Sequence, residues 1–510
     1  MTATDPGTQA PDLQVDSAAP VAAAGRGTAA DAAAIMLERI FSQVAQLMVF
    51  VYAARVLGPT EFGVFALASA CAVLLFRVAE MGWSPFIMSR GDDWLVVQQV
   101  LFVAIMSGIA FAAVGACAVL LAGLDQDLRS LMMLFAVWIA LANAASAQKA
   151  VLTWAARIRS SALSEIAGEA VGLVVAIAAL KQGAGVFALV YGRLACQLVV
   201  LCVTFAVTRR APRRGLPGPI MRELAHFSLQ YLSSRILVNV RLQFSTLIVG
   251  VFLGPTMVGF FRAAERVAGS VTELIYVPGQ VLAWQHLRRA RNGGTAETRM
   301  ARISQTLVRQ CTVLTALGAP FLVWLAVFND EIVRGLFGAG WEPAGMLLMI
   351  LALGRLPMFP GVFIEPFLTI IGAVRRLPRY TLAIFLVSVV LTMSFAPFGA
   401  VPLAYSQAGV SLFAAVRAVQ VFRDTAGILP GELARSLRGT FIALVFGVAA
   451  LFIFGHAIVA VPMHPLLFAV LSGLAGGAVY LAVLFFVDPA LGALLADAVK
   501  LPSRSSETLS

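Results

Sequence analysis

The chain has 510 residues, of which 60% are hydrophobic and only 12% are charged, and its mean hydropathy is +0.90. This composition excludes a water-soluble domain, which would carry about twice that charged fraction. The net charge of +11 does not indicate nucleic-acid binding, because the arginines lie between hydrophobic runs and therefore belong at a membrane surface.

The first segment, residues 1–30, is rich in Ala, Pro, Gly and Asp and shows no apolar face. We expect it to form a disordered tail. It is not typical of a cleaved signal peptide, because no basic region precedes a short hydrophobic stretch.

After this tail, runs of roughly twenty or more apolar residues predict fourteen membrane-spanning helices. The runs do not alternate with polar residues, which excludes a transmembrane β-barrel. The predicted spans are Ala32–Leu57, Phe62–Trp83, Trp94–Ala122, Leu128–Val151, Ala162–Leu180, Val186–Thr208, Glu223–Gly254, Val258–Leu282, Ser304–Phe328, Pro343–Ile371, Leu377–Ala396, Ala400–Val421, Gly439–Val461 and Leu466–Asp488.

The connecting segments differ in charge. Those after the even-numbered spans, up to the twelfth, contain nineteen arginines, whereas the alternate segments contain four basic residues together with several acids. Basic segments of membrane proteins face the cytoplasm. We therefore predict a multi-pass membrane protein with both termini in the cytoplasm.

Two stretches of the chain repeat one pattern. Residues 39–68 and 235–264 share ten identities in thirty positions at a constant offset of 196, including the run Leu-Gly-Pro-Thr at Leu57–Thr60 and Leu253–Thr256. This offset equals six predicted spans, so both repeats enter the membrane in the same direction.

The sequence thus predicts an all-α membrane protein with two pseudo-symmetric six-helix bundles and two additional C-terminal helices. The expected parts are a cytoplasmic tail (1–30), an N-terminal bundle (31–208), a cytoplasmic linker (209–222), a C-terminal bundle (223–422), two additional helices (423–490) and a second cytoplasmic tail (491–510).

Signatures of enzymes and metal sites are absent from the sequence. It contains neither the phosphate-binding pattern GxxxxGK[ST] nor the zinc-binding pattern HExxH. The five cysteines form no CxxC pair, and the four histidines are widely dispersed. We therefore expect no catalytic residues, no metal and no cofactor.

Charged and polar residues inside the predicted spans are the candidate site, because such residues are costly in a bilayer. In the first helix of each bundle they share one helix face, and in the second helix they follow similar spacing. The candidate substrate-binding residues are Arg39, Gln43, Arg77, Arg235, Asn239, Arg241, Arg262 and Arg266. Aligned arginines suit an anion such as phosphate, whereas a carrier of cationic drugs would present carboxylates.

Other roles stay open for several of these residues. Arg39 and Arg235 lie about nineteen residues before their Gly-Pro turns and are also consistent with anchors near the cytoplasmic surface. Arg77 with Glu80, and Arg266 with Glu273, also fit structural ion pairs. Three intramembrane acids are candidates for ion or proton coupling: Glu80, Glu273 and Glu365.

Two motifs resemble a known family. The segment Tyr52–Gly63, with an arginine, Leu-Gly-Pro and Phe-Gly, resembles the opening of bacterial polysaccharide flippases of the MOP exporter superfamily. The segment Leu336–Ala344 resembles the external loop before the tenth helix of that family. The resemblance implies a MATE-like fold with two bundles that open alternately, and a substrate of oligosaccharide linked to undecaprenyl pyrophosphate.

The function expected from this resemblance is translocation of repeat units for exopolysaccharide, capsule or lipopolysaccharide synthesis. The expected partners are the lipid-linked oligosaccharide, the bilayer, and a polymerase and chain-length regulator of the same pathway, with no nucleic acid. Two alternatives within the superfamily stay open, a peptidoglycan lipid II flippase and a multidrug exporter. A membrane polymerase or glycosyltransferase is the alternative from another class.

Overall fold

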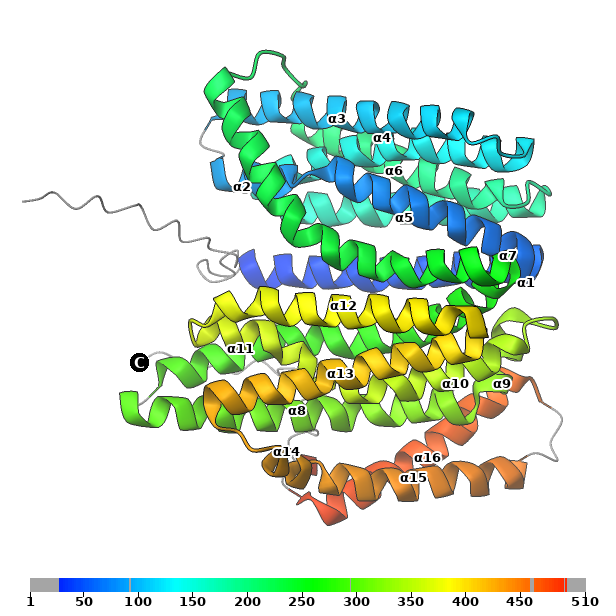
Figure 1. The fold of residues 1–510 in the computed structure, drawn as a ribbon, viewed down its shortest axis with the longest axis vertical. Coiled ribbons are helices and arrows are strands. Elements are labelled where there is room, and N and C mark those ends of the chain that lie inside the picture. The colour runs from blue at the N-terminus through cyan, green and yellow to red at the C-terminus, as the bar shows by residue number, and fades with distance from the viewer. Residues whose placement is uncertain (1–26, 91–92, 294, 459–462, 490, 493–510) are drawn as a thin grey trace, which may run out of the picture.

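The structure, a computed structural model, describes residues 27–90, 93–293, 295–458, 463–489 and 491–492. All regular elements of these ranges are helices, most of which run side by side (Figure 1). The α-helices are α1 (Gly27–Glu80), α2 (Trp83–Arg90), α3 (Trp94–Leu121), α4 (Gln126–Trp154), α5 (Ile158–Lys181), α6 (Phe187–Thr208), α7 (Gly218–Asn292), α8 (Ala296–Val327), α9 (Asn329–Phe337), α10 (Pro343–Arg355), α11 (Ile364–Ile370), α12 (Leu377–Phe395), α13 (Ala400–Ala426), α14 (Pro430–Ser436), α15 (Arg438–Ile458) and α16 (Pro465–Val487). Three 3₁₀ helices connect them: η1 (Leu356–Phe363), η2 (Val374–Arg376) and η3 (Ala396–Phe398).

The number of membrane crossings agrees with the prediction. Eleven helical stretches of the described chain are long and apolar enough to span a membrane. Two of them, Ala33–Ser89 and Asn239–Asn292, have 57 and 54 residues, and each is broken at a glycine into two crossings. When each of these two stretches is counted as two crossings, the number of crossings rises from eleven to thirteen. Helix α13, with 27 residues, is the fourteenth crossing.

The repeated Leu-Gly-Pro-Thr run is the turn of each broken helix. Gly58 has φ 72° and ψ 175°, and Gly254 has φ 80° and ψ 173°. Only glycine adopts this backbone conformation readily. Pro59 and Pro255 follow at the start of the next helical segment, where a missing N–H costs no hydrogen bond. The sequence therefore folds α1 and α7 into hairpins of the same design.

The two hairpins pack against each other at their turns, which we call the Gly-Pro end. A Cβ atom built on Gly63 would lie 1.8 Å from the carbonyl oxygen of Pro255, and one built on Gly259 would lie 2.1 Å from that of Pro59. The contact is reciprocal, since these four residues are equivalent pairs of the repeat. Only glycines permit so close an approach of the two backbones.

The segment between α9 and α10 closes over the same end. Arg55 donates to the carbonyl oxygens of Leu336 (2.6 Å) and Gly335 (2.5 Å). The indole of Trp341 is buried and donates to the carbonyl oxygen of Ala54 at 3.2 Å. The external loop suggested by the sequence is thus fixed to the first hairpin.

Figure 1 shows two lobes separated by α1 and α7. Helices α2–α6 form the upper lobe and α8–α13 the lower lobe, while α15 and α16 lie below the lower lobe. Trp324 of α8 holds the added helices by donating to the carbonyl oxygen of Ala469 at 2.7 Å. The two predicted bundles and the appended pair are therefore present.

Several helix boundaries differ from the prediction; the eighth span, for example, continues to Asn292, and the ninth begins at Ala296. Residues 27–30, predicted as tail, are the first turn of α1, and residues 218–222, predicted as linker, begin α7 after Pro217. The tenth span is not one helix, because Pro357 and Pro360 interrupt it between α10 and α11. The rest of the predicted N-terminal tail and almost all of the C-terminal tail lie outside the described residues.

Candidate functional site

Each lobe contains a polar cavity. The first cavity, of about 340 Å³, lies among α1, α4, α5, α6 and α7. The second cavity, of about 440 Å³, lies among α7, α10, η1, α12 and α13. Both halves of the α7 hairpin contribute to both cavities, so α7 separates one cavity from the other.

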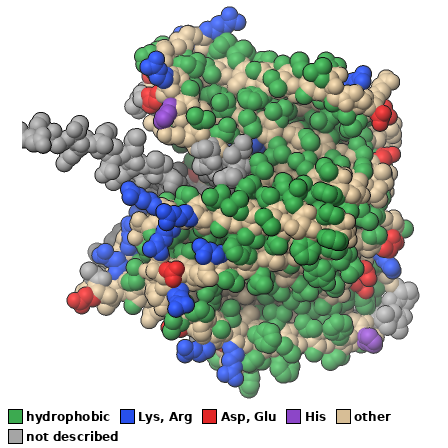
Figure 2. Space-filling model, viewed as in Figure 1, with side chains coloured by type: hydrophobic (Ala, Val, Ile, Leu, Met, Phe, Trp, Pro, Cys, Tyr) green, Lys and Arg blue, Asp and Glu red, His purple; other side chains and the backbone are tan. Residues whose placement is uncertain are grey.

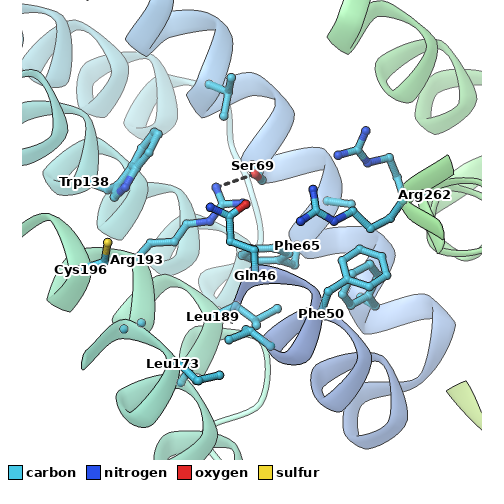
Figure 3. A pocket seen from close by; sticks show the side chains of 18 of the residues that line it. Gln46, Phe50, Phe65, Ser69, Trp138, Leu173, Leu189, Arg193, Cys196 and Arg262 are labelled. Atoms are coloured by element: carbon cyan, nitrogen blue, oxygen red, sulfur yellow. Dashed lines mark hydrogen bonds between the residues drawn. The ribbon is translucent and has the colours of Figure 1, made fainter. Parts of the chain in front are cut away.

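Arg193 of α6 is the central cation of the first cavity (Figure 3). Its Nη1 donates to Ser69 Oγ at 2.8 Å, and its guanidinium lies 5.1 Å from the ring centroid of Phe65 and 5.8 Å from that of Trp138. Arginine stacks well on aromatic faces. A guanidinium has five N–H groups, and within the described chain only this one hydrogen bond is made, so the remaining donors are available to a ligand.

Two further arginines reach the first cavity from the second half of α7. Arg262 pairs with Glu265, with 2.7 Å between Nη1 and Oε2, and Arg266 donates from Nη2 to Gln43 Oε1 at 3.3 Å. The Nε of Arg266 is buried and has no hydrogen-bond partner among the described residues. Figure 3 shows Arg262 on the opposite side of the cavity from Arg193. Guanidiniums from α6 and from α7 therefore face one space.

Glu169 of α5 is the only acid among the described residues that line the first cavity. Its Oε1 accepts a hydrogen bond from Gln46 Nε2 at 2.7 Å. Arg262 is paired with Glu265, so Arg193 and Arg266 are the two guanidiniums set against the one lining carboxylate. The first cavity is therefore suited to an anion such as a phosphate or pyrophosphate.

Gln43 of α1 contacts α7 at the boundary between the two cavities. Besides accepting from Arg266, it donates from Nε2 to Glu273 Oε2 at 2.8 Å. Glu273 lines the second cavity and Arg266 the first. The amide thus connects the polar groups of the two cavities, because it accepts one hydrogen bond and donates another. A carboxylate at this position could only accept, and an ammonium could only donate.

The remaining predicted residues lie in different places. Arg241 lines the second cavity and not the first. Arg77 pairs with Glu80 at 2.8 Å, in agreement with the alternative of a structural ion pair, and Glu80 also accepts from Ser146 at 3.1 Å.

Arg39 and Glu365 have exposed side chains and line neither cavity. Asn239 also lines neither cavity, and the side chain of Arg235 lies outside the described part of the structure. The candidate residues predicted from the sequence therefore do not form one site, because the fold distributes them among two cavities, an ion pair and the surface.

Arg193, Arg355 and Glu169 line the cavities but were not among the candidate site residues. The signal was present, since each is a charged residue within a predicted span. What the sequence lacked was the direction in which each helix face points.

Within the described ranges, no group of three or more His, Cys, Asp or Glu side chains is placed to hold a metal ion. The five cysteines are free thiols. The polar chemistry of the two cavities is therefore that of arginines, carboxylates, amides and hydroxyls.

Comparison with known proteins places the chain in a family of polysaccharide biosynthesis proteins. Residues 53–345 match the model of a family described as "Polysaccharide biosynthesis protein". The chain is 26% identical over 326 residues to the succinoglycan biosynthesis transport protein ExoT of Rhizobium meliloti (strain 1021). That alignment covers 62% of this chain and 64% of the relative, so the match spans less than two thirds of the relative's length.

The fold is similar to that of solved transporters. The structure of the lipid II flippase MurJ in an inward closed conformation matches with a TM-score of 0.71, covering 89% of this chain and 99% of that chain at 12% identity. An inward-facing multidrug resistance transporter of the MATE family and MOP superfamily matches with a TM-score of 0.55, covering 76% and 94% at 15% identity. At these identities the likeness shows the fold alone, which is the expected MATE-like architecture.

Proposed function

Because the chain belongs to the polysaccharide biosynthesis protein family, we propose that it is a flippase for oligosaccharide repeat units linked to undecaprenyl pyrophosphate. The repeat units would serve synthesis of exopolysaccharide, capsule or lipopolysaccharide. The observation that carries the proposal is the convergence of Arg193 of α6 with Arg262 and Arg266 of α7 on one cavity. A polymerase and a chain-length regulator that use the exported units are part of the same proposal.

In this mechanism the first cavity holds the pyrophosphate. Arg193 is preoriented by Ser69 and by the aromatic rings around it, so little side-chain freedom is lost when it binds phosphate oxygens. Arg266 offers a buried donor that the described protein does not satisfy. The glycan follows through the polar space between the lobes. The prenyl chain stays in the lipid bilayer, where its apolar surface carries no free-energy penalty.

The distribution of charged side chains indicates how the protein is oriented in the membrane, and therefore from which side the substrate enters. Figure 2 shows Lys and Arg side chains gathered mainly at the left end of this face, and Asp and Glu side chains along the right end, where Figure 1 places the bends of α1 and α7. By the positive-inside rule the basic end faces the cytoplasm of a bacterial inner-membrane protein. The Gly-Pro end is then periplasmic, and substrate enters from the cytoplasmic side.

Transport without an ATP-binding pattern requires an ion gradient or mass action. Among the predicted coupling acids, Glu273 fits this role best, because it joins α1 to α7 through Gln43 at the boundary of the lobes. Glu80 is engaged in an ion pair, and Glu365 lies on the exposed side of α11.

The test is export in a strain lacking the chain, complemented with variants at equal membrane level. Arg193→Gln and Arg266→Gln should each lower polysaccharide export at least about tenfold, since each removes a charged donor to phosphate. Arg129→Gln is the matched control, because Arg129 lies on the surface and bonds only to the carbonyl oxygen of Leu124 at 3.1 Å. Normal export by the Arg193→Gln, Arg266→Gln double variant would contradict the proposal.

A lipid II flippase is the second candidate, favoured by the similarity of the fold to MurJ. Introducing the chain into a strain depleted of its own lipid II flippase separates the two. Restored growth would assign lipid II as the substrate, whereas continued lysis together with restored polysaccharide export supports the repeat-unit flippase.

A further inference from the structure

The second cavity is built differently from the first. Arg241 of α7 and Arg355 at the end of α10 both line it, and neither guanidinium has a hydrogen bond or ion pair with any described residue. Gly269 leaves space for Arg355, whose Nη1 lies 3.4 Å from the position of a Cβ atom built there. Two arginines are therefore held in a polar cavity with their donors unused.

The carboxylates of this cavity are already engaged. Glu265 pairs with Arg262, and Glu273 accepts from Gln43 at 2.8 Å. Because Arg262 neutralises Glu265, Arg241 and Arg355 face one remaining carboxylate, that of Glu273, which leaves one uncompensated positive charge in the second cavity. A charge inside a membrane protein requires an opposite charge nearby, so the cavity is suited to a ligand with a single negative charge.

The neutral lining suits a sugar. Hydroxyl and amide groups line the cavity beside the two arginines, and such groups both donate and accept hydrogen bonds, as sugar hydroxyls do. These neutral residues are Ser245, Thr272, Ser388, Gln407 and Ser411.

The repeat shows that the second cavity is not a copy of the first. Helices α6 and α13 align at an offset of 214, and each follows a glycine with positive φ. The matched positions are Gly185, Leu189, Tyr191 and Arg193 for α6, and Gly399, Leu403, Tyr405 and Gln407 for α13. The central arginine of the first cavity is therefore a glutamine in the second, while Arg241 corresponds to Ala45 in the first repeat.

From this arrangement we propose that the second cavity binds a carboxylate carried by a sugar of the transported glycan. The inference rests on the proposed flippase function and names its substrate class, an acidic oligosaccharide. The first cavity takes the pyrophosphate with Arg193 and Arg266, beside the Arg262–Glu265 pair, and the second takes one carboxylate with Arg241 and Arg355. A monoanion matches the single uncompensated charge of the second cavity.

The experiment is calorimetric titration of the purified full-length chain in lipid nanodiscs. The probes are a tetrasaccharide containing glucuronic acid, a neutral tetrasaccharide of the same length, acetate and inorganic pyrophosphate. The wild type should bind the acidic tetrasaccharide about tenfold more tightly than the neutral one, a difference expected for one charged contact. Acetate should compete weakly, since it lacks the sugar hydroxyls.

Variants assign this preference to the cavity. Arg355→Gln and Arg241→Gln should each remove most of the preference for the acidic probe and leave pyrophosphate binding unchanged, whereas Arg193→Gln should do the reverse. Arg355→Lys keeps the charge and should retain part of the preference, and Arg129→Gln is the control for folding and lipid insertion.

Three results would overturn the proposal: equal affinity for both tetrasaccharides, loss of the acidic preference in Arg193→Gln to the same extent as in Arg355→Gln, or acetate competing as well as the acidic sugar. Failure of the wild type to bind pyrophosphate would instead count against the proposed role of the first cavity, with the acidic preference still measurable.

Discussion

Thr60 and Thr256 share one hydrogen bond, with 2.9 Å between their Oγ1 atoms, although they are 196 residues apart. They are equivalent residues of the internal repeat, so the pseudo-twofold axis that relates the two hairpins passes between them. Around them, each hairpin places a glycine against the backbone of the other. The Gly-Pro end is therefore closed, and the two hairpins must separate before a substrate passes this end.

A disulfide between these positions tests whether that separation occurs. The contact of the two hydroxyls shows that the side chains at these positions point toward each other, as a disulfide requires. In Thr60→Cys, Thr256→Cys, mild oxidation should form the bond and reduce export to the level of the deletion strain, and a reductant should restore it. The measurement is polysaccharide export before and after oxidation.

Thr60→Cys alone is the control for that experiment, because the protein also contains five native cysteines, three of them exposed. Its export should not respond to oxidation. Complete disulfide formation with normal export would mean that the protein works without opening the Gly-Pro end.

The close approach of the hairpins makes their glycines irreplaceable. In Gly63→Ala or Gly259→Ala, the new methyl group would lie within about 2 Å of a carbonyl oxygen and force the hairpins apart. Overpacking of this kind costs about 1–3 kcal/mol. Thermal unfolding in nanodiscs should show the lower stability, together with greater accessibility of Thr256→Cys to a thiol reagent in the same background.

Gly431→Ala is the matched control, since Gly431 is helical and its Cβ position has no heavy atom within 4 Å. Alanine there should leave stability unchanged or raise it slightly. Equal unfolding temperatures for Gly63→Ala and Gly431→Ala would show that the hairpins adjust without cost.

The sequence was sufficient to predict the hairpins, because a Gly-Pro turn between apolar runs is a local signal. It also predicted the number of crossings, since loop charge and hydrophobic length are independent of how helices pack. The assignment of polar residues to cavities depended on packing. Arg266 and Glu273, seven residues apart on α7, belong to one predicted stripe, yet they line different cavities because α7 lies between the lobes.

Arg193 shows the same limit. The cost of placing this charge in the bilayer was evident from the sequence. The orientation of the guanidinium in the cavity, however, depends on Ser69 and on Phe65, which lie more than 120 residues earlier. No local pattern connects these residues. Contacts between helices distant in sequence are therefore what the sequence alone could not supply.

The position of Glu273 predicts how transport responds to a proton gradient. If its carboxylate takes up a proton when the bond from Gln43 breaks, Glu273→Gln mimics the protonated state permanently. Export by the wild type should fall when a protonophore collapses the gradient, whereas the slower export of Glu273→Gln should show little further decrease.

Glu80→Gln is the comparison for this experiment, because the Glu80 carboxylate pairs with Arg77 and does not join the lobes. Its export should keep the response of the wild type to the protonophore. The same response in Glu273→Gln would remove Glu273 from the coupling mechanism.

Glu342 gives a prediction for pH outside the membrane-spanning segments. Hydrogen bonds to its carboxylate from its own backbone N–H and from that of Gly340, which lies 3.1 Å from Oε2, hold the pKa of this side chain below its usual value of 4.5. A carboxyl with a lowered pKa stabilises the folded loop at pH values above 4.5, and this contribution is lost as the pH falls through the folded-state pKa. At neutral pH the loop therefore has its full stability.

Hydrogen exchange of the Gly340 amide measures this effect. Glu342→Gln should lower the protection of that amide at pH 7, because a neutral amide oxygen is a weaker acceptor than a carboxylate. The difference from the wild type, corrected for intrinsic exchange, should shrink once the pH is low enough to protonate Glu342. Glu331→Gln, in the first turn of α9, should leave Gly340 unaffected. Equal protection of Gly340 in Glu342→Gln and the wild type at pH 7 would show that Trp341 and Arg55 fix the loop without this carboxylate.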